Sequence, residues 1–329
     1  MCFLSISLLF LTKKATMVHT GIDKQNDLCY NSVVICEDFA KTGVRSMNKV
    51  IIVTSLKGGV GKTTLTANLA MSLAESGKSV IAIDCDLESR CLDMILGLEN
   101  DSLYNLADIL SGRCELDDAI TRDERCDNLS FIAAPSIGFD RNSDEYSECF
   151  TPEKISALIA ALRDSYEYIL FDLPAHPDKW YELLLGHANY ALVVAMHTAV
   201  SIRSAEKTAM TIVETYEKLM EQSGEELLPD DEGGLKIRLV INGFKHRDVT
   251  DGTRSGIYDI ISKTSVKLLG VVPNDERMAA AQESGVLAYQ LKGDSASCSA
   301  FKNIAARIDG VSIPLLSGIL GKKARRKSF

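Results

Sequence analysis

From residue 50 onward, short hydrophobic runs alternate with longer amphipathic stretches. The runs rich in β-branched residues predict buried strands at Val50–Val53, Ser79–Ile83, Leu129–Ala133, Tyr168–Phe171, Tyr190–Met196, Leu235–Ile241 and Lys267–Val272. The amphipathic stretches predict helices at Thr64–Glu75, Pro152–Ser165, Ser201–Gln222, Glu276–Ser284 and Cys298–Ile308. Strands that alternate with helices in this way predict one α/β domain with a doubly wound, mostly parallel sheet.

A glycine-rich segment, residues 57–64, joins the first predicted strand to the first predicted helix. Glycines in such a turn let backbone N–H groups converge on an anion at the helix N-terminus. Lys62 would add a positive charge for the β- and γ-phosphates, and the Thr63 hydroxyl would ligate Mg²⁺. The segment therefore predicts a P-loop for ATP and Mg²⁺, with the binding residues Gly58, Gly59, Val60, Gly61, Lys62, Thr63 and Thr64.

Polar residues also follow three other predicted strands. Asp84 and Asp86 follow the second strand, Asp172 the fourth and Asn242 the sixth. Ligands of such sheets bind at the carboxyl ends of the strands, and carboxylates beside phosphates suit Mg²⁺. Asp84 and Asp172 are therefore candidate metal residues together with Thr63. A salt bridge or helix cap is the alternative role for Asp84 and Asp86, and a turn cap is the alternative for Asn242.

Charge is unevenly distributed along the 329 residues, whose formal net charge is −9. The last nine residues carry five positive charges and no acid, which leaves −14 for the rest of the chain. An acidic body argues against broad nucleic-acid binding, because that binding needs Lys and Arg to displace counterions. The nine cysteines include no CxxC pair and no zinc spacing, so they are expected to be reduced thiols.

The C-terminal residues 311–329 are predicted to form a basic amphipathic tail. Pro314 suits a first helical position, and four apolar residues would share one face of the helix: Leu315, Leu316, Ile319 and Leu320. An apolar face followed by Lys and Arg is typical of segments that bind anionic lipid surfaces. The alternatives are a solvated basic tail and a C-terminal helix packed on the body.

Residues 1–46 carry no comparable signal. The apolar run Cys2–Leu11 is about half the length needed to span a bilayer, and it lacks the flanks of a signal peptide. Thr16–Arg45 shows no sustained period. Residues 1–46 are therefore predicted to be a disordered or spurious extension, with the natural start at Met47 and the ATPase domain at 47–310. A membrane-anchoring N-terminus is the alternative.

Four motifs together resemble the MinD/ParA group of deviant Walker A ATPases. They are KGGVGKTT at 57–64, IDCD at 83–86, FDLP at 171–174 and GVVPND at 270–275. Within the group the chain is most similar to the MinD branch, because Arg90, Leu92 and Asp93 match its R-x-L-D motif. The segment Tyr104–Ser111 and the acidic loop Gly224–Gly234 are also similar. The resemblance covers nearly all of residues 47–329.

The resemblance implies roles for individual residues. Lys57 would reach the phosphates bound by a partner subunit, so that ATP holds a homodimer together. Asp86 would position the attacking water, and the catalytic set would be Lys57, Lys62 and Asp86. Asp172 would hold Mg²⁺ through a water, with Asp84 supporting the same ion. Asn242 would hydrogen-bond adenine.

The resemblance also implies a function. A MinD-like ATPase would bind an anionic membrane as an ATP dimer, peripherally on the inner face of the cell membrane, and position the division septum. A MinC- or MinE-type or other regulatory protein would be its partner. The alternative is a ParA-like partitioning ATPase that binds DNA as a dimer, which the charge distribution disfavours. A metal-insertion or flagellar-number ATPase is a third alternative, against which the absence of a cluster-bridging cysteine pair counts.

Three positions depart from the family pattern. Leu56 and Glu88 stand where glycines are usual, and Ala175-His176 replaces Ala-Gly after the Walker B aspartate. A carboxylate at Glu88 would slow hydrolysis or change the partner surface. His176 would be either a pH-sensitive contact near the γ-phosphate or a plain surface residue.

Overall fold

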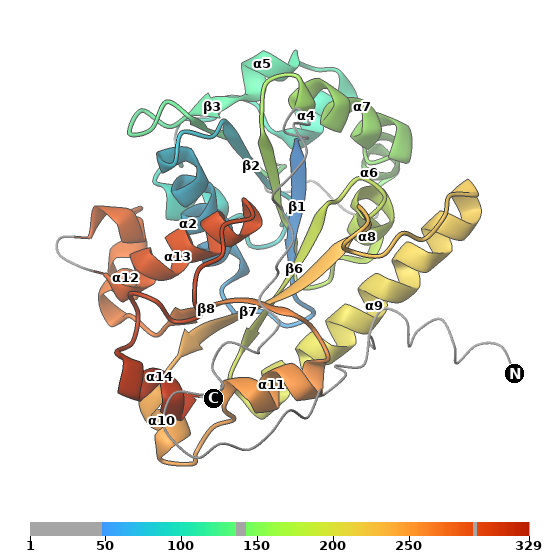
Figure 1. Cartoon of the computed structure of the whole chain (residues 1–329). Helices are drawn as coiled ribbons and strands as arrows, with labels where there is room; N and C mark the ends of the chain where they lie inside the picture. Colours follow the sequence, from blue (N-terminus) through green and yellow to red (C-terminus); the bar gives the residue numbers. More distant parts are fainter. Residues whose placement is uncertain (1–47, 100, 136–142, 292–294, 329) are drawn as a thin grey trace, which may run out of the picture.

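An eight-stranded sheet forms the centre of the computed structural model, which describes residues 48–99, 101–135, 143–291 and 295–328 (Figure 1). The strand order is β3-β4-β2-β5-β1-β6-β7-β8, and only the β3–β4 pair is antiparallel. The strands are β1 (Lys49–Thr54), β2 (Val80–Asp84), β3 (Thr121–Arg122), β4 (Leu129–Ile132), β5 (Tyr168–Asp172), β6 (Tyr190–Met196), β7 (Lys236–Phe244) and β8 (Leu268–Pro273). The predicted doubly wound α/β fold is confirmed.

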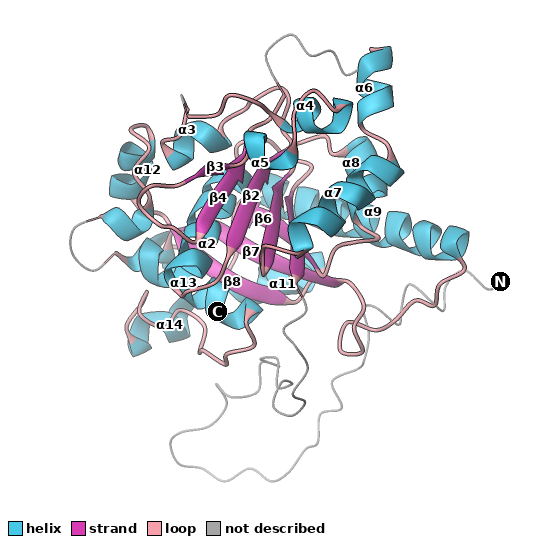
Figure 2. Cartoon of the chain, turned by 90° about the horizontal axis from the view of Figure 1, so that it is seen from above, coloured by secondary structure: helices cyan, strands magenta, loops and turns pink. Residues whose placement is uncertain are grey.

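Helices cover both faces of the sheet (Figures 1 and 2). One face packs against α2 (Lys62–Glu75), α3 (Leu92–Leu96), α12 (Glu276–Gln282), the 3-10 helix η1 (Ala288–Gln290) and α13 (Ala296–Ile308). The other packs against α4 (Leu106–Ser111), α5 (Leu116–Ala119), α6 (Asp144–Cys149), α7 (Pro152–Arg163), α8 (Asp178–Leu184), α9 (Ala199–Ser223) and α11 (Ile257–Thr264). Two further helices, α10 (His246–Thr250) and α14 (Lys322–Ser328), contact each other beyond the end of β7.

Alternate residues of each central strand enter opposite core layers. In β1, Val50 and Ile52 belong to the cluster under α7, α8 and α9, whereas Ile51 and Val53 belong to the cluster under α2 and α13. All four side chains are fully buried. A strand covered on both faces needs apolar residues at every position, which is why these strands appear in the sequence as continuous hydrophobic runs.

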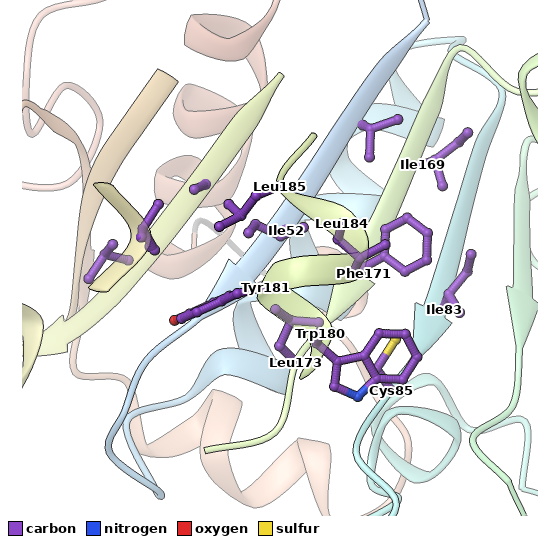
Figure 3. Close-up of a cluster of buried hydrophobic side chains, with 14 of the residues drawn as sticks. Ile52, Ile83, Cys85, Ile169, Phe171, Leu173, Trp180, Tyr181, Leu184 and Leu185 are labelled. Carbon is purple, nitrogen blue, oxygen red and sulfur yellow. The ribbon is translucent and has the colours of Figure 1, made fainter. Parts of the chain in front are cut away.

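Helix α8 connects the ends of three strands. Tyr181 makes a 2.7 Å hydrogen bond between its hydroxyl and that of Thr54, the last residue of β1. Trp180 packs edge-on against Phe150 of the α6–α7 connection and lies beside Cys85, just after β2 (Figure 3). Because α8 follows β5 after a five-residue turn, these contacts join the carboxyl ends of β1, β2 and β5.

The C-terminal segment differs from its prediction. Residues 315–319 form consecutive turns instead of a helix, and the C-terminal helix begins only at Lys322. Leu316 and Gly318 have left-handed φ angles of 58° and 72°, which interrupt a right-handed helix. Leu316 of these turns is buried in the core, so this part of the chain packs on the body, although not as a helix. The prediction for residues 1–46 lies outside the described residues.

Across the part of the chain that the structure describes, no helix combines the length and apolarity needed to cross a membrane.

Replacing Gly270 by alanine tests the packing between β8 and α13. A Cβ at Gly270 would lie 2.3 Å from Cγ1 of Ile304, which is fully buried. We expect Gly270→Ala to lower the free energy of unfolding by about 1–3 kcal/mol through overpacking, measured by urea denaturation. Gly186→Ala is the matched control, since no atom lies within 4 Å of its added Cβ. Equal midpoints for the two variants would contradict this packing.

Candidate nucleotide-binding site

The glycine-rich loop runs from the end of β1 to the first residue of α2. Gly61 caps α2 with a left-handed φ of 89°, and a Cβ there would lie 2.1 Å from Nδ2 of Asn242. Both the φ angle and this close approach require glycine at the position. Gly58 and Gly59 are exposed, so the rim of the loop is open to a ligand. The loop and the N-terminus of α2 together form the geometry expected of a phosphate cradle.

Lys62 is the first residue of α2 and is only 8% exposed. Burial lowers the pKa of its ammonium group, whereas the carboxylates of Asp172 and Asp86 act in the opposite direction. The ammonium group of Lys62 is thus influenced by the carboxylate that ends β5 and by one that follows β2. Thr63 and Thr64 follow it at the N-terminus of the helix and remain partly exposed.

Asp172 ends β5, where it is aligned with Val53 of β1 and Asp84 of β2. Thr66 donates a 3.0 Å hydrogen bond from Oγ1 to Oδ1 of Asp172. Burial raises the pKa of Asp172 to about 6, and a hydrogen bond from Thr63 and the charge of Lys62 oppose that shift. Asp172 therefore lies beside Lys62 and Thr63 of the predicted phosphate loop, which is the position expected of a Walker B carboxylate.

Asp84 and Asp86 shape the loop that follows β2. Asp84 accepts backbone N–H bonds from Asp86 at 2.8 Å and from Leu92 at 3.2 Å. Its pKa is raised well above the ordinary value, first by burial and then by the charge of Asp172. Asp86 in turn accepts the N–H groups of Glu88 at 3.1 Å and Ser89 at 3.0 Å. Both carboxylates therefore hold this loop in place.

Two amide side chains border the site on the side of β7 and α12. Asn242 donates from Nδ2 to the carbonyl oxygen of Val60 at 2.8 Å, so it clamps the phosphate loop. Gln282 accepts a 3.4 Å hydrogen bond from the Thr64 hydroxyl, and its own Nε2 is buried without a hydrogen-bond partner among the described residues. A single glutamine on a helix matches no motif, so Gln282 could not be predicted from the sequence.

The residues at the loop entrance and at the atypical positions lie nearer the surface. Lys57 is partly exposed, and its backbone N–H donates to Ser55 Oγ at 3.3 Å. Leu56 donates its backbone N–H to the Thr208 hydroxyl of α9 at 3.1 Å. Glu88 and His176 are exposed. Within one chain Lys57 is therefore placed at the rim of the loop and not at its floor.

The site suits a nucleotide whose phosphate oxygens supply part of the coordination shell of Mg²⁺. Within the described ranges, no group of three or more His, Cys, Asp or Glu side chains could hold a metal ion. Mg²⁺ in phosphate sites typically takes one or two protein oxygens and completes its shell with phosphate and water. Thr63 beside Asp172, next to an anion cradle that ends in Lys62, provides such a partial set. The fold and the site define a P-loop nucleotide hydrolase.

Comparison with known proteins assigns the family. The chain belongs to the CobQ/CobB/MinD/ParA nucleotide-binding domain family, whose model matches residues 51–288. It is 36% identical over 264 residues to the septum site-determining protein MinD of Helicobacter pylori, covering 80% of this chain and 91% of that protein. The predicted membership of the MinD/ParA family and the predicted ATPase activity are confirmed.

Solved structures agree with this assignment. The chain superposes on MinD from the MinC:MinD cell division complex of Aquifex aeolicus with a TM-score of 0.65 and 31% identity, covering 81% of this chain and 98% of that one. It superposes on MinD of Pyrococcus horikoshii in complex with Mg-ADP with a TM-score of 0.62 and 25% identity, covering 84% and 100%.

Replacing Lys62 by alanine tests the phosphate cradle. Wild-type protein in Mg-ATP at a hundredfold excess over Kd is expected to gain about 2.7 kcal/mol of stability by linkage. The Lys62→Ala variant should gain almost none, because it lacks the buried charge. The thermal unfolding temperature with and without Mg-ATP measures the gain. Lys302→Ala, an exposed lysine on α13, serves as the control. If Mg-ATP raises the unfolding temperature of Lys62→Ala as much as that of wild type, Lys62 does not bind the nucleotide.

Proposed function

We propose that this chain is a MinD-type ATP-dependent switch that dimerises on Mg-ATP, binds membrane and positions the division septum. The observation that carries the proposal is the phosphate loop itself, in which Lys57 stands at the rim and Lys62 is buried beside Asp172 and Asp86. Similarity along 91% of a septum site-determining MinD supports the same reading.

The phosphate groups would be bound by backbone N–H groups of the loop and by Lys62. Burial has removed water from the Lys62 ammonium group, so its charge attracts phosphate more strongly than an exposed lysine would. Mg²⁺, when bound, supplies charge neutralisation at the phosphate oxygens. Thr63 would ligate it directly and Asp172 through a water, while Asn242, at the edge of the loop, would hydrogen-bond adenine.

Asp86 would orient the water that attacks the γ-phosphate. Its carboxylate is held by the N–H groups of Glu88 and Ser89, so it cannot swing freely away from the site. Asp84 would act through this loop, since its two oxygens fix the backbone at Asp86 and Leu92. We therefore assign Asp84 to positioning and to support of the magnesium shell.

Lys57 would complete the site of a second subunit. It is partly exposed at the rim of the loop, where a side chain can leave its own subunit. Two chains facing each other would then bind two nucleotides at their interface, so that the dimer forms when ATP is bound. We further propose a MinC- or MinE-type or other regulatory partner, and the MinC:MinD complex of Aquifex aeolicus supports the MinC-type partner.

The membrane is the surface that best matches the charge distribution. The nine C-terminal residues carry +5 and the remainder −14, so only the tail is attracted to anionic lipid. A single short basic element binds lipid weakly, and dimerisation brings two such elements to the same membrane. The protein would accordingly be cytoplasmic and peripheral on the inner face of the membrane. The ParA-like alternative would need a basic surface on the dimer, which the acidic body disfavours.

Two substitutions separate binding from hydrolysis. Asp86→Asn should retain ATP binding and lose roughly 10²–10⁴-fold in hydrolysis rate, because the water loses its orienting carboxylate. Lys57→Ala should retain ATP binding but neither dimerise nor hydrolyse ATP. Phosphate release and size-exclusion chromatography with a non-hydrolysed ATP analogue measure these outcomes. Asp127→Asn, at an exposed carboxylate near the start of β4, is the matched control. Full hydrolysis by monomeric Lys57→Ala would contradict the shared site.

Co-sedimentation distinguishes membrane from DNA. With the ATP analogue we expect binding to phosphatidylglycerol vesicles and none to duplex DNA. Deleting residues 321–329 should abolish vesicle binding and leave ATP binding intact, because Leu316 stays in place. ATP-dependent binding to DNA without binding to vesicles would replace the septum function by the partitioning function.

A further inference from the structure

We propose that Gln282 of α12 is a nucleotide-binding residue whose side-chain amide donates a hydrogen bond to an α-phosphate oxygen of ATP or ADP. The inference rests on the proposed nucleotide site and extends it, because Gln282 lies 218 residues after Thr64 and outside the glycine-rich loop. It does not depend on the proposed dimer or on membrane binding.

The amide group of Gln282 is only half used within the chain. Its Oε1 accepts a 3.4 Å hydrogen bond from the Thr64 hydroxyl. Its Nε2 is buried and has no hydrogen-bond partner among the described residues. A buried N–H group without a partner is unfavourable, and it is satisfied when an acceptor arrives. The free atom is a donor, so the ligand atom that fits it is an acceptor.

Gln282 borders the same loop as Asn242. A Cβ added at Gly61 would lie 2.1 Å from Nδ2 of Asn242 and 3.8 Å from Cβ of Thr64. Thr64 and Asn242 therefore flank the residue that caps α2, and Gln282 contacts Thr64. Nδ2 of Asn242 already donates to the carbonyl oxygen of Val60. The unpartnered donor on this border of the loop is thus the amide of Gln282.

The position of Gln282 along the site favours the α-phosphate. Thr63 is assigned to Mg²⁺ at the terminal phosphates, and Asn242 is assigned to adenine. Thr64 adjoins Thr63 in the chain and flanks Gly61 together with Asn242, so Gln282 faces the part of a nucleotide between these two ends. That part carries the α-phosphate and the ribose. The α-phosphate oxygens are charged acceptors, which form stronger hydrogen bonds with an N–H donor than neutral groups do.

Helix α12 is fixed at its N-terminus. Asp275 caps the helix by accepting the backbone N–H groups of Arg277 at 3.1 Å and Met278 at 3.3 Å. Ser297 at the start of α13 donates to the other carboxylate oxygen of Asp275 at 3.1 Å. Met278 is buried in the core layer under α2 and α13. The first turn of α12 therefore cannot shift without disturbing the core.

The segment after α12 is fixed as well. Arg125 donates from Nη1 to the carbonyl oxygen of Gly285 at 3.1 Å, and Asp123 holds the guanidinium group of Arg125 with both carboxylate oxygens. Asn68 of α2 accepts the backbone N–H of Ala288 at 2.8 Å. Helix α12 is thus tied to the helix that starts at the phosphate loop. A donor held on such a fixed element loses little further freedom when the ligand binds.

Substitutions at Gln282 test the donor directly. Gln282→Met keeps the length of the side chain and removes both polar atoms. We expect it to weaken binding of ADP and of a non-hydrolysed ATP analogue roughly ten- to hundredfold, because both carry an α-phosphate and lose one hydrogen bond to a charged group. Gln282→Glu should weaken both further, since its carboxylate repels the α-phosphate. Isothermal titration calorimetry of the full chain with Mg²⁺ measures the Kd values.

The pattern of losses identifies the ligand atom. A loss confined to the ATP analogue would place the contact at the γ-phosphate and overturn the assignment. Unchanged or tighter binding by Gln282→Glu would also overturn it, because a ribose hydroxyl can donate to a carboxylate whereas a phosphate oxygen cannot. ADP is the decisive ligand, since its binding does not require the proposed dimer.

Thr64→Val separates direct contact from positioning. If Gln282 served only to orient the Thr64 hydroxyl, Gln282→Met would change nothing in a Thr64→Val background. We expect a further loss of roughly tenfold in ADP affinity in the double variant, because the contact with the α-phosphate is made by Gln282 itself. No further loss would overturn the direct contact.

Glu283→Gln is the matched control, because Glu283 is the next residue along the chain and is exposed. It should bind ADP with the wild-type Kd. Thermal unfolding without nucleotide checks that Gln282→Met is folded. If its unfolding temperature is lowered, Gln282→Asn takes its place. That variant keeps the amide but shortens the side chain by one methylene, and it should lose ADP affinity in the same range.

Failure of the Gln282 contact and failure of the nucleotide site give different results. If Lys62→Ala loses nucleotide binding while both Gln282→Met and Gln282→Glu bind like wild type, the Gln282 contact is wrong and the nucleotide site stands. If wild type binds neither ADP nor the ATP analogue, the nucleotide site itself is wrong, and the role of Gln282 is lost with it.

Discussion

A buried positive charge organises this protein. Lys62 is the first residue of α2 and is only 8% exposed, and the carboxylates of Asp172 and Asp86 favour its charged form against the effect of burial. Those residues are far apart in sequence and meet only because β1, β2 and β5 are adjacent and parallel. A lone charge at this depth would be costly, so the strand order, the loop and the carboxylates depend on one another. The protein part of this nucleotide-binding cluster is therefore assembled within one chain.

The elements around this cluster connect it to the rest of the molecule. Tyr181 ties α8 to the last residue of β1, and Asp84 fixes the backbone after β2. Asn242 joins β7 to the phosphate loop. Each contact involves a strand end next to the predicted phosphate site. Helix α14 contacts α10 just beyond the end of β7, the strand that carries Asn242.

Much of this arrangement could be predicted from the sequence. All seven predicted strands are present, because a strand buried on both faces must be a continuous apolar run. Such a run can be recognised in the sequence without knowing which elements pack against it. The phosphate loop was predictable because its glycines and Lys62 are consecutive. The short helices α3, α4, α5, α6, α8, α10 and α11 were not predicted, since four to eight residues carry little periodicity and are stabilised by tertiary packing. Gln282 was missed because its place beside Thr64 depends on how α12 packs.

The sequence by itself determined the family, the P-loop chemistry and which residues stand at the strand ends, because these features are encoded within a few consecutive positions. Only the tertiary structure decided what each carboxylate and amide touches, and what becomes of the tail. Leu316 and its neighbours read equally well as a lipid-binding face or as core, because an apolar pattern states that a surface is to be buried and not what buries it. In the conformation described Leu316 belongs to the protein core, and Asn303 of α13 and His246 of α10 hydrogen-bond to the residues that follow it.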